Sequence, residues 1–144
     1  TLGYGYLDTS VDAVDNPQTP AVEQNPAVLP GAPDNSFTAD LDYTFPSFGL
    51  GELMLNVNYS KVDEAEFVSF VQRGFNIPGY DLWNARLSLG ELSMGHGTAS
   101  IALWGKNLGD EEYLLDGIES FPWSPLVAPF GEGRTWGVDF NYEY

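Results

Sequence analysis

The segment SFTADLDYTF, residues 36–45, decides the fold class, because an apolar residue occupies every second position in it. Phe37 and Leu41 fall on one side of an extended chain, whereas Asp40 and Asp42 fall on the other. Successive side chains of a β-strand point to opposite faces of the sheet. The alternation therefore predicts a strand with one apolar face and one polar face.

The same two-residue period recurs on both sides of this segment, and a helical period is hard to find. It predicts further strands at residues 2–9, 52–61, 80–89, 98–106 and 134–144. We therefore expect one all-β unit over residues 1–144, an antiparallel up-and-down sheet of about six strands.

The connections between these strands alternate between long and short. Residues 10–35, 62–79 and 107–133 are long connections, and residues 46–51 and 90–97 are short turns. Long loops without structure of their own are uncommon in compact soluble domains, whereas outer-membrane barrels combine long extracellular loops with short periplasmic turns. Several predicted strands have the ~9–11 residues that span a bilayer. The pattern favours a segment of a transmembrane β-barrel. Prolines confirm that the first connection is no central strand: Pro17, Pro20, Pro26, Pro30 and Pro33.

Composition limits the classes of partner. The chain has 21 acidic and 5 basic residues and a formal net charge of −16, a surface that repels nucleic-acid phosphates. It has no cysteine, which excludes disulfides and thiolate metal sites. No run of ~18 apolar residues predicts a transmembrane helix. The opening TLGYGYLD predicts no signal peptide.

Catalytic and metal chemistry find little support. The single histidine, His96, lies in a glycine-rich turn, where a solvated residue is the common role. No Ser-His-Asp arrangement has a suitable spacing. The acidic runs at residues 63–66 and 110–112 offer oxygen ligands for Ca²⁺ but lack EF-hand spacing, so solvated loops are the simpler interpretation. We expect no enzyme, no cofactor and no metal site.

Two soluble folds remain as alternatives, a β-sandwich and a lipocalin-like barrel, each with its apolar side chains inside. The polar face helps to distinguish a transmembrane barrel from these two soluble folds. Lipid requires apolar side chains only on the outer face of a barrel, so the inner face can line a wet lumen. The residues that suit such a lumen are Asp40, Asp42, Asn56, Asn58, Asn84, Arg86 and Lys106. Aromatic residues that suit membrane interfaces lie towards strand ends: Tyr43, Phe45, Tyr59, Trp83, Tyr142 and Tyr144.

Four stretches carry a resemblance to a known family. They are LPGAPDNSFTADLDYTF (29–45), GYDLWNARLSL (79–89), SIALWGKNLGDEEYLLD (100–116) and FGEGRTWGVDFNYEY (130–144). In this order and spacing they resemble the C-terminal part of TonB-dependent outer-membrane receptors. Two positions depart from the family pattern: Tyr144 replaces the usual terminal Phe, and Gly133 stands where Pro often precedes the Arg.

The resemblance implies a position at the end of a barrel of about 22 strands in a Gram-negative outer membrane. Such a receptor imports a scarce nutrient, for example an iron–siderophore complex, cobalamin or a glycan. Its implied partners are a plug domain, the remaining barrel strands, the TonB energy-coupling protein through an N-terminal region, the outer-membrane assembly machinery and the lipid bilayer. Six strands are fewer than the ~8 of the smallest transmembrane barrels, so the chain alone is predicted not to close. The rival is a soluble acidic β-domain that binds carbohydrate through loop aromatics.

Both hypotheses, the receptor segment and the carbohydrate-binding domain, predict candidate functional residues. Apolar, proline-stiffened loop segments suit ligand capture, although packing against a neighbouring loop is equally simple. The candidates for ligand contact are Phe67, Phe70, Phe75, Phe121, Trp123 and Phe130. The candidates that face the lumen are Asn84, Arg86 and Lys106. By resemblance, the terminal strand carries the assembly signal, formed by Trp136, Val138, Phe140, Tyr142 and Tyr144.

Overall fold

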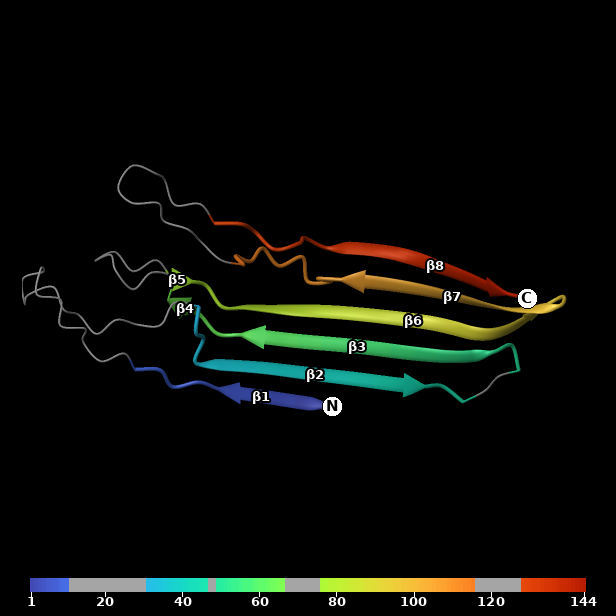
Figure 1. The fold of residues 1–144 in the computed structure, drawn as a ribbon, viewed down its shortest axis with the longest axis horizontal. Helices are drawn as coiled ribbons and strands as arrows, with labels where there is room; N and C mark the ends of the chain where they lie inside the picture. The colour runs from blue at the N-terminus through green and yellow to red at the C-terminus, as the bar shows by residue number, and fades with distance from the viewer. Residues whose placement is uncertain (11–30, 47–48, 67–75, 116–127) are drawn as a thin grey trace, which may run out of the picture.

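The computed structural model describes residues 1–10, 31–46, 49–66, 76–115 and 128–144, and that part of the chain is all-β without a helix. Figure 1 shows long strands that run side by side. They are β1 (Leu2–Tyr6), β2 (Asn35–Thr44), β3 (Glu52–Val62), β6 (Tyr80–Met94), β7 (Gly97–Lys106) and β8 (Thr135–Glu143).

These strands form one sheet in the order β1-β2-β3-β6-β7-β8, and every neighbouring pair is antiparallel. The predicted up-and-down antiparallel sheet is therefore confirmed. Short turns join β2 to β3 and β6 to β7 at one end of the sheet, and the long connections leave from the other end (Figure 1). The second long connection contains a two-stranded hairpin that the sequence pattern missed, β4 (Ala65–Glu66) with β5 (Asn76–Ile77).

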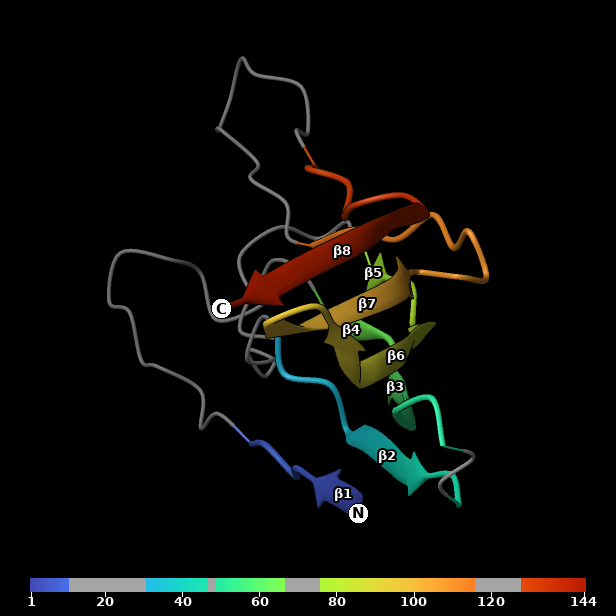
Figure 2. The same cartoon turned by 90° about the vertical axis from the view of Figure 1, so that its right-hand side faces the viewer.

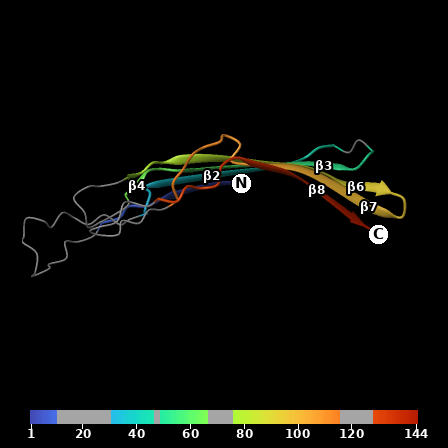
Figure 3. The same ribbon diagram turned by 90° about the horizontal axis from the view of Figure 1, so that it is seen from above.

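The sheet is open. β1 and β8 lie at its two edges and do not pair with each other. Viewed along the strands in Figure 2, the sheet follows an arc from β1 to β8, and Figure 3 shows it as a thin curved layer. Curvature of this kind follows from the right-handed twist of neighbouring strands. The class is thus an open antiparallel sheet rather than a closed barrel.

Strand β6 corrects one predicted boundary. The short turn was expected at residues 90–97, but β6 continues to Met94, and only Gly95 and His96 form the turn. A β-bulge between Leu89 and Leu92 makes this possible, with Glu91 in the left-handed region at φ 56°. The bulge inserts one extra residue into β6, because Gly90 and Glu91 stand opposite Ser100 alone, and it shifts the alternation. A glycine-rich turn signal is therefore misleading here.

The register aligns the residues of like character. Across β2, β3 and β6, Leu41 faces Val57 and Val57 faces Ala85, whereas Asp40 faces Asn58 and Asn58 faces Asn84. We call the two sides of the sheet the apolar face and the polar face. The apolar face has the side chains of Leu41, Tyr43, Leu53, Leu55, Val57, Tyr59, Trp83, Ala85, Leu87, Leu89, Ile101, Leu103, Trp136, Val138, Phe140 and Tyr142.

The apolar face has no second layer in the described part of the chain. Hydrophobic residues that are buried there are limited to Ile77, Ala99 and Ala102. By contrast, Leu103 is 54% exposed, Val138 58% and Phe140 65%. A sheet in water ordinarily buries its apolar face against another layer. This sheet presents that face outward.

Candidate functional site

A row of hydrogen-bonded side chains crosses the polar face. Asn58 Nδ2 donates to Asp40 Oδ1 at 2.8 Å, and Asn84 Nδ2 donates to Asn58 Oδ1 at 3.0 Å. Asn84 Oδ1 in turn accepts from the backbone N–H of Asn107 at 3.0 Å. These groups stand on β2, β3 and β6 and at the end of β7, and the strand register brings them into line. We call this row the amide ladder.

A second polar cluster joins β6, β7 and β8. Arg86 Nη1 lies 2.7 Å from Asp139 Oδ2, and Trp104 Nε1 donates to Asp139 Oδ1 at 3.1 Å. Both side chains of the ion pair are about half exposed, so solvent screens the pair and it adds little stability of its own. The Trp104 ring lies against Gly137, where an added Cβ would stand 2.5 Å from its Cζ2 atom. The cluster therefore fixes the position of Arg86 on the polar face.

A hollow of about 300 Å³ lies beside this cluster on the polar face. Its lining includes Met54, Ser88 and Asn141 together with Arg86 and Asp139. The walls are mixed in character, and the one positive charge among these residues is already paired with a carboxylate. The hollow is thus a polar recess in a curved sheet rather than an apolar ligand pocket of the usual kind.

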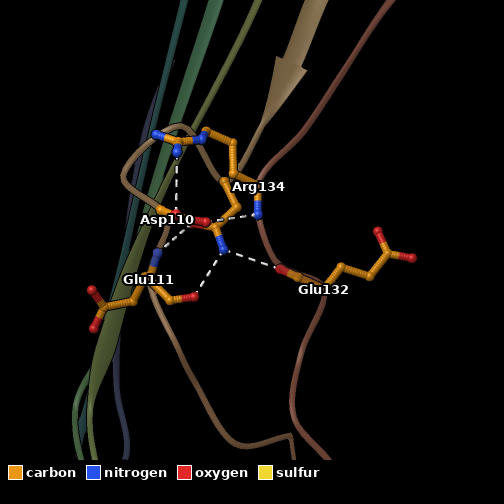
Figure 4. Close-up of polar contacts among 5 residues, drawn as sticks. Asp110, Glu111, Glu132 and Arg134 are labelled. Atoms are coloured by element: carbon orange, nitrogen blue, oxygen red, sulfur yellow. Dashed lines mark hydrogen bonds and ion pairs between the residues drawn. The ribbon is translucent and has the colours of Figure 1, made fainter.

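The start of the third long connection is held by Asn107, which is only 4% exposed. Its Nδ2 donates to the carbonyl oxygens of Glu111 at 2.9 Å and Glu132 at 3.0 Å. Its Oδ1 accepts from the backbone N–H of Glu111 at 2.9 Å. Asp110 faces Arg134 from across the connection, with contacts of 3.2 Å to the backbone N–H and to Nη2 (Figure 4). We call Asn107, Glu111, Glu132, Asp110 and Arg134 the clasp.

The clasp gives a structural role to the NLGDEEY motif. Asn107 and Asp110 both adopt left-handed backbone conformations, at φ 48° and 57°. Asn and Asp tolerate this region better than other residues with a side chain. The clasp thus joins the first residues of the connection to the last residues before β8. Asn, Gly and Asp are typical turn residues, and here the turn that they form ties down the start of the third connection.

Beyond the clasp, the third connection continues as a paired stem. Leu114 and Phe130 form a β-bridge, and the backbone N–H of Gly131 donates to the carbonyl oxygen of Tyr113 at 2.8 Å. The Tyr113 ring lies 4.5 Å from the Tyr80 ring at the start of β6. A side chain on Gly131 would overlap the Tyr113 ring. Glycine at this position therefore allows the stem to pack closely on the sheet.

The predicted site residues fall into three groups. Phe67, Phe70, Phe75, Phe121 and Trp123 lie outside the described residues. Phe130 is described, is 67% exposed and belongs to the paired stem. The lumen-facing candidates share the polar face: Asn84 is in the amide ladder, Arg86 is in the ion pair, and Lys106 is exposed opposite Thr135. The terminal residues Trp136, Val138, Phe140 and Tyr142 project from the apolar face of β8, and Tyr144 is 101% exposed.

Sequence reasoning missed Asp139, Trp104 and Gly137 as one cluster. Each residue lies on the polar face of a predicted strand, but their proximity depends on the register between β7 and β8, in which Trp104 faces Gly137. One feature of the sequence could have indicated the cluster: Trp104 lies on the polar side of an alternating strand. A large ring in that position needs a small neighbouring residue and an acceptor for its N–H.

Comparisons of the chain with protein-family models, with curated proteins and with solved structures find no match. Among the described residues, no helix has the length and apolar character needed to cross a membrane. Within the same residues, no three or more His, Asp or Glu side chains gather into a group suited to a metal ion. His96 is exposed in its two-residue turn. The functional argument therefore rests on the two faces of the sheet.

Proposed function

We propose that this chain is the C-terminal barrel segment of a TonB-dependent outer-membrane receptor, with its apolar face against lipid. This proposal rests on one observation: the apolar face has exposed large hydrophobic residues on five of its six strands and partly buried ones on β3, while hydrogen bonds join the side chains of the polar face. Soluble monomers rarely expose contiguous apolar patches larger than a few hundred Å². Contact with lipid removes the cost of exposing this apolar surface to water, and it does so without a second protein layer.

The distribution of residue types on the apolar face supports a lipid partner. Its middle is aliphatic, with Leu55 facing Leu87 and Leu103 facing Val138. Aromatic rings flank this band at both ends. Tyr59 and Trp83 lie 4.5 Å apart towards the long connections. Towards the short turns lie Phe45, whose N–H donates to the carbonyl oxygen of Leu53, and Tyr142, which faces Ala99. Aromatic side chains prefer membrane–water interfaces, so the arrangement matches two girdles around an apolar band.

Charged side chains are absent from the aliphatic middle of the apolar face. Apart from the bulge in β6, the strand alternation puts two charged residues on the apolar face, Lys61 and Asp81. They face each other across β3 and β6, next to the aromatic row on the side of the long connections. A charge at the margin of a bilayer costs little, whereas one at the midplane costs ~2–4 kcal/mol for Arg or Lys.

In the proposed receptor, this segment would complete the barrel wall, supply three extracellular connections and provide the terminal strand for assembly. The nutrient would be an iron–siderophore complex, cobalamin or a glycan, moved inward with TonB-coupled energy. No chemical step is assigned to this chain. The plug domain, the remaining strands, the TonB protein and the assembly machinery are the proposed partners.

The rival function is that of a soluble acidic β-domain that binds carbohydrate through loop aromatics. It requires the apolar residues to form a core, as in a sandwich. In the described structure Leu103, Val138 and Phe140 are exposed instead, and no second sheet covers them. The exposed face therefore favours the membrane segment.

Site-directed spin labels test this proposal in the intact protein in outer-membrane vesicles. The 144-residue chain has no cysteine, so a single introduced cysteine is the one attachment point within this segment. Labels at Leu103 and Val138 should be relaxed by oxygen, which concentrates in lipid. Labels at Ser88 and Asn141, on the polar face, should be relaxed by a water-soluble nickel chelate. Equal access of the nickel chelate to all four positions would contradict the proposal.

A further inference from the structure

The amide ladder forms an unbroken chain of hydrogen bonds from Asp40 on β2 to the backbone N–H of Asn107. Its three contacts measure 2.8, 3.0 and 3.0 Å. Asp40, Asn58 and Asn84 are all partly buried, and Asn107 is buried. The ladder therefore connects one strand of the polar face to the base of the third connection, which two other strands separate from it.

The direction of the ladder is fixed at both of its ends. The backbone N–H of Asn107 can only donate, so the atom of Asn84 that faces it must be the carbonyl oxygen. The ionised carboxylate of Asp40 can only accept, so the atom of Asn58 that faces it must be the amino nitrogen. Each amide has its acceptor on one side and its donors on the other. Reversing one amide therefore requires the next one to reverse.

The end of the ladder lies at the clasp. Asn107 holds Glu111 and Glu132 through its side chain while its backbone N–H depends on Asn84. A buried N–H that loses its acceptor carries the full cost of its lost hydration. A reversed ladder would place the amino group of Asn84 against this N–H, so that two donors would face each other.

We propose that Asp40 is a positioning residue for the base of the third connection and acts by fixing the direction of the amide ladder. A basic group that inserts between Asp40 and Asn58 donates to both and turns the Asn58 oxygen towards itself. Asn84 then reverses, and Asn107 loses its acceptor. The occupant that would loosen the clasp is thus an ammonium or guanidinium group on the polar face. This coupling between Asp40 and Asn107 depends only on side chains of the sheet, and it goes beyond the transport function proposed above.

A lysine at position 40 reproduces such a group, and amide hydrogen exchange of a peptide that covers residues 107–111 reports the result. In the intact protein, Asp40→Lys should speed exchange in this peptide about tenfold, since one buried hydrogen bond is lost. Asp42→Lys is the matched control: it makes the same change of charge on the same face of β2, but its partner Asn56 is outside the ladder. Asp40→Asn is a second control, because the amide oxygen can still accept from Asn58.

The decisive variant is Asp40→Lys combined with Asn84→Asp. A carboxylate at position 84 accepts from Asn107 and from a reversed Asn58, so exchange should return to the original rate although the lysine remains. Faster exchange in Asp40→Lys alone, with recovery in the double variant, supports the relay. If Asp40→Lys fails to assemble, assembly of the double variant and of Asp42→Lys supports it equally. The proposal is overturned if the double variant is no better than Asp40→Lys, if Asp42→Lys has the same effect, or if Asp40→Lys has none.

Discussion

The indole ring of Trp104 on β7 lies against the backbone of Gly137 on β8, and no side chain fits between them. An added Cβ at Gly137 would stand 2.5 Å from Trp104 Cζ2. In this position the ring donates from Nε1 to Asp139, the carboxylate that also pairs with Arg86. Gly137 thus allows the contact that orients Asp139 and, through it, Arg86 on the polar face.

Gly137→Ala should therefore destabilise the protein by ~1–3 kcal/mol, because Trp104 must leave its position or the strands must separate. The measurement is the free energy of unfolding in detergent, with tryptophan fluorescence as a local probe. Gly133→Ala is the matched control, because nothing lies within 4 Å of the added Cβ. In a Trp104→Ala background, the Gly137→Ala change should cost little. An equal cost in both backgrounds would show that the ring is not the cause.

The clasp makes a second prediction. Asn107→Ala removes the side-chain hydrogen bonds to Glu111 and Glu132 from a buried position, so we expect a loss of ~2–4 kcal/mol, about 1 kcal/mol or more for each lost bond. The third connection should also become sensitive to protease at a lower denaturant concentration. Asn141→Ala, at an exposed position of β8, serves as the control and should change neither quantity. Identical protease resistance of both variants would refute the structural role of the clasp.

The apolar band allows a comparison of two neighbouring residues on β6. Leu87→Arg places a charge in the aliphatic middle of the apolar face and should cost ~2–4 kcal/mol if that face meets the bilayer. Ser88→Arg makes a charge of the same kind one residue further on, where it points to the polar face. Levels of folded protein in the outer membrane should fall for the first variant and stay near normal for the second. Equal levels of the two variants would argue against a one-sided lipid contact.

Tyr144 allows assembly to be separated from stability. It is fully exposed, and its ring is stacked on Tyr142 at 6.5 Å, so its loss removes little packing from the sheet. If the terminal aromatic residue is an assembly signal, Tyr144→Ser should lower the amount of receptor in the membrane without changing the unfolding midpoint of the molecules that assemble. Glu143→Ser is the neighbouring control. Normal membrane levels of Tyr144→Ser would count against the signal.

Alternation alone was enough to predict the strands at residues 36–45, 52–61 and 98–106 to within a residue or two of their observed ends. The prediction of strands from alternation failed where the alternation is interrupted or too short to see. The bulge at Glu91 carries β6 to Met94, and the short β4–β5 hairpin has too few residues to show a period. The first strand also ends earlier than expected, at Tyr6.

The candidate site was less accessible from sequence. Asn84 and Arg86 could be assigned to the polar face from their spacing, but their partners could not, because Asn107 and Asp139 are distant in the chain and reach them only through register. In the structure Asn107 is buried beside Asn84 of β6, at the end of β7 and next to the approach to β8. Side-chain contacts between residues so far apart in the chain depend on the register of every strand between them, which alternation alone does not determine.

The central claim is that the apolar face meets lipid, and fractionation of cells that produce the intact parent protein tests it most directly. The protein should be recovered in the outer-membrane fraction and should stay there after washes with carbonate and urea, because a lipid-embedded apolar band is not released by removing electrostatic contacts. Recovery of the folded protein in the soluble periplasmic fraction would contradict the account.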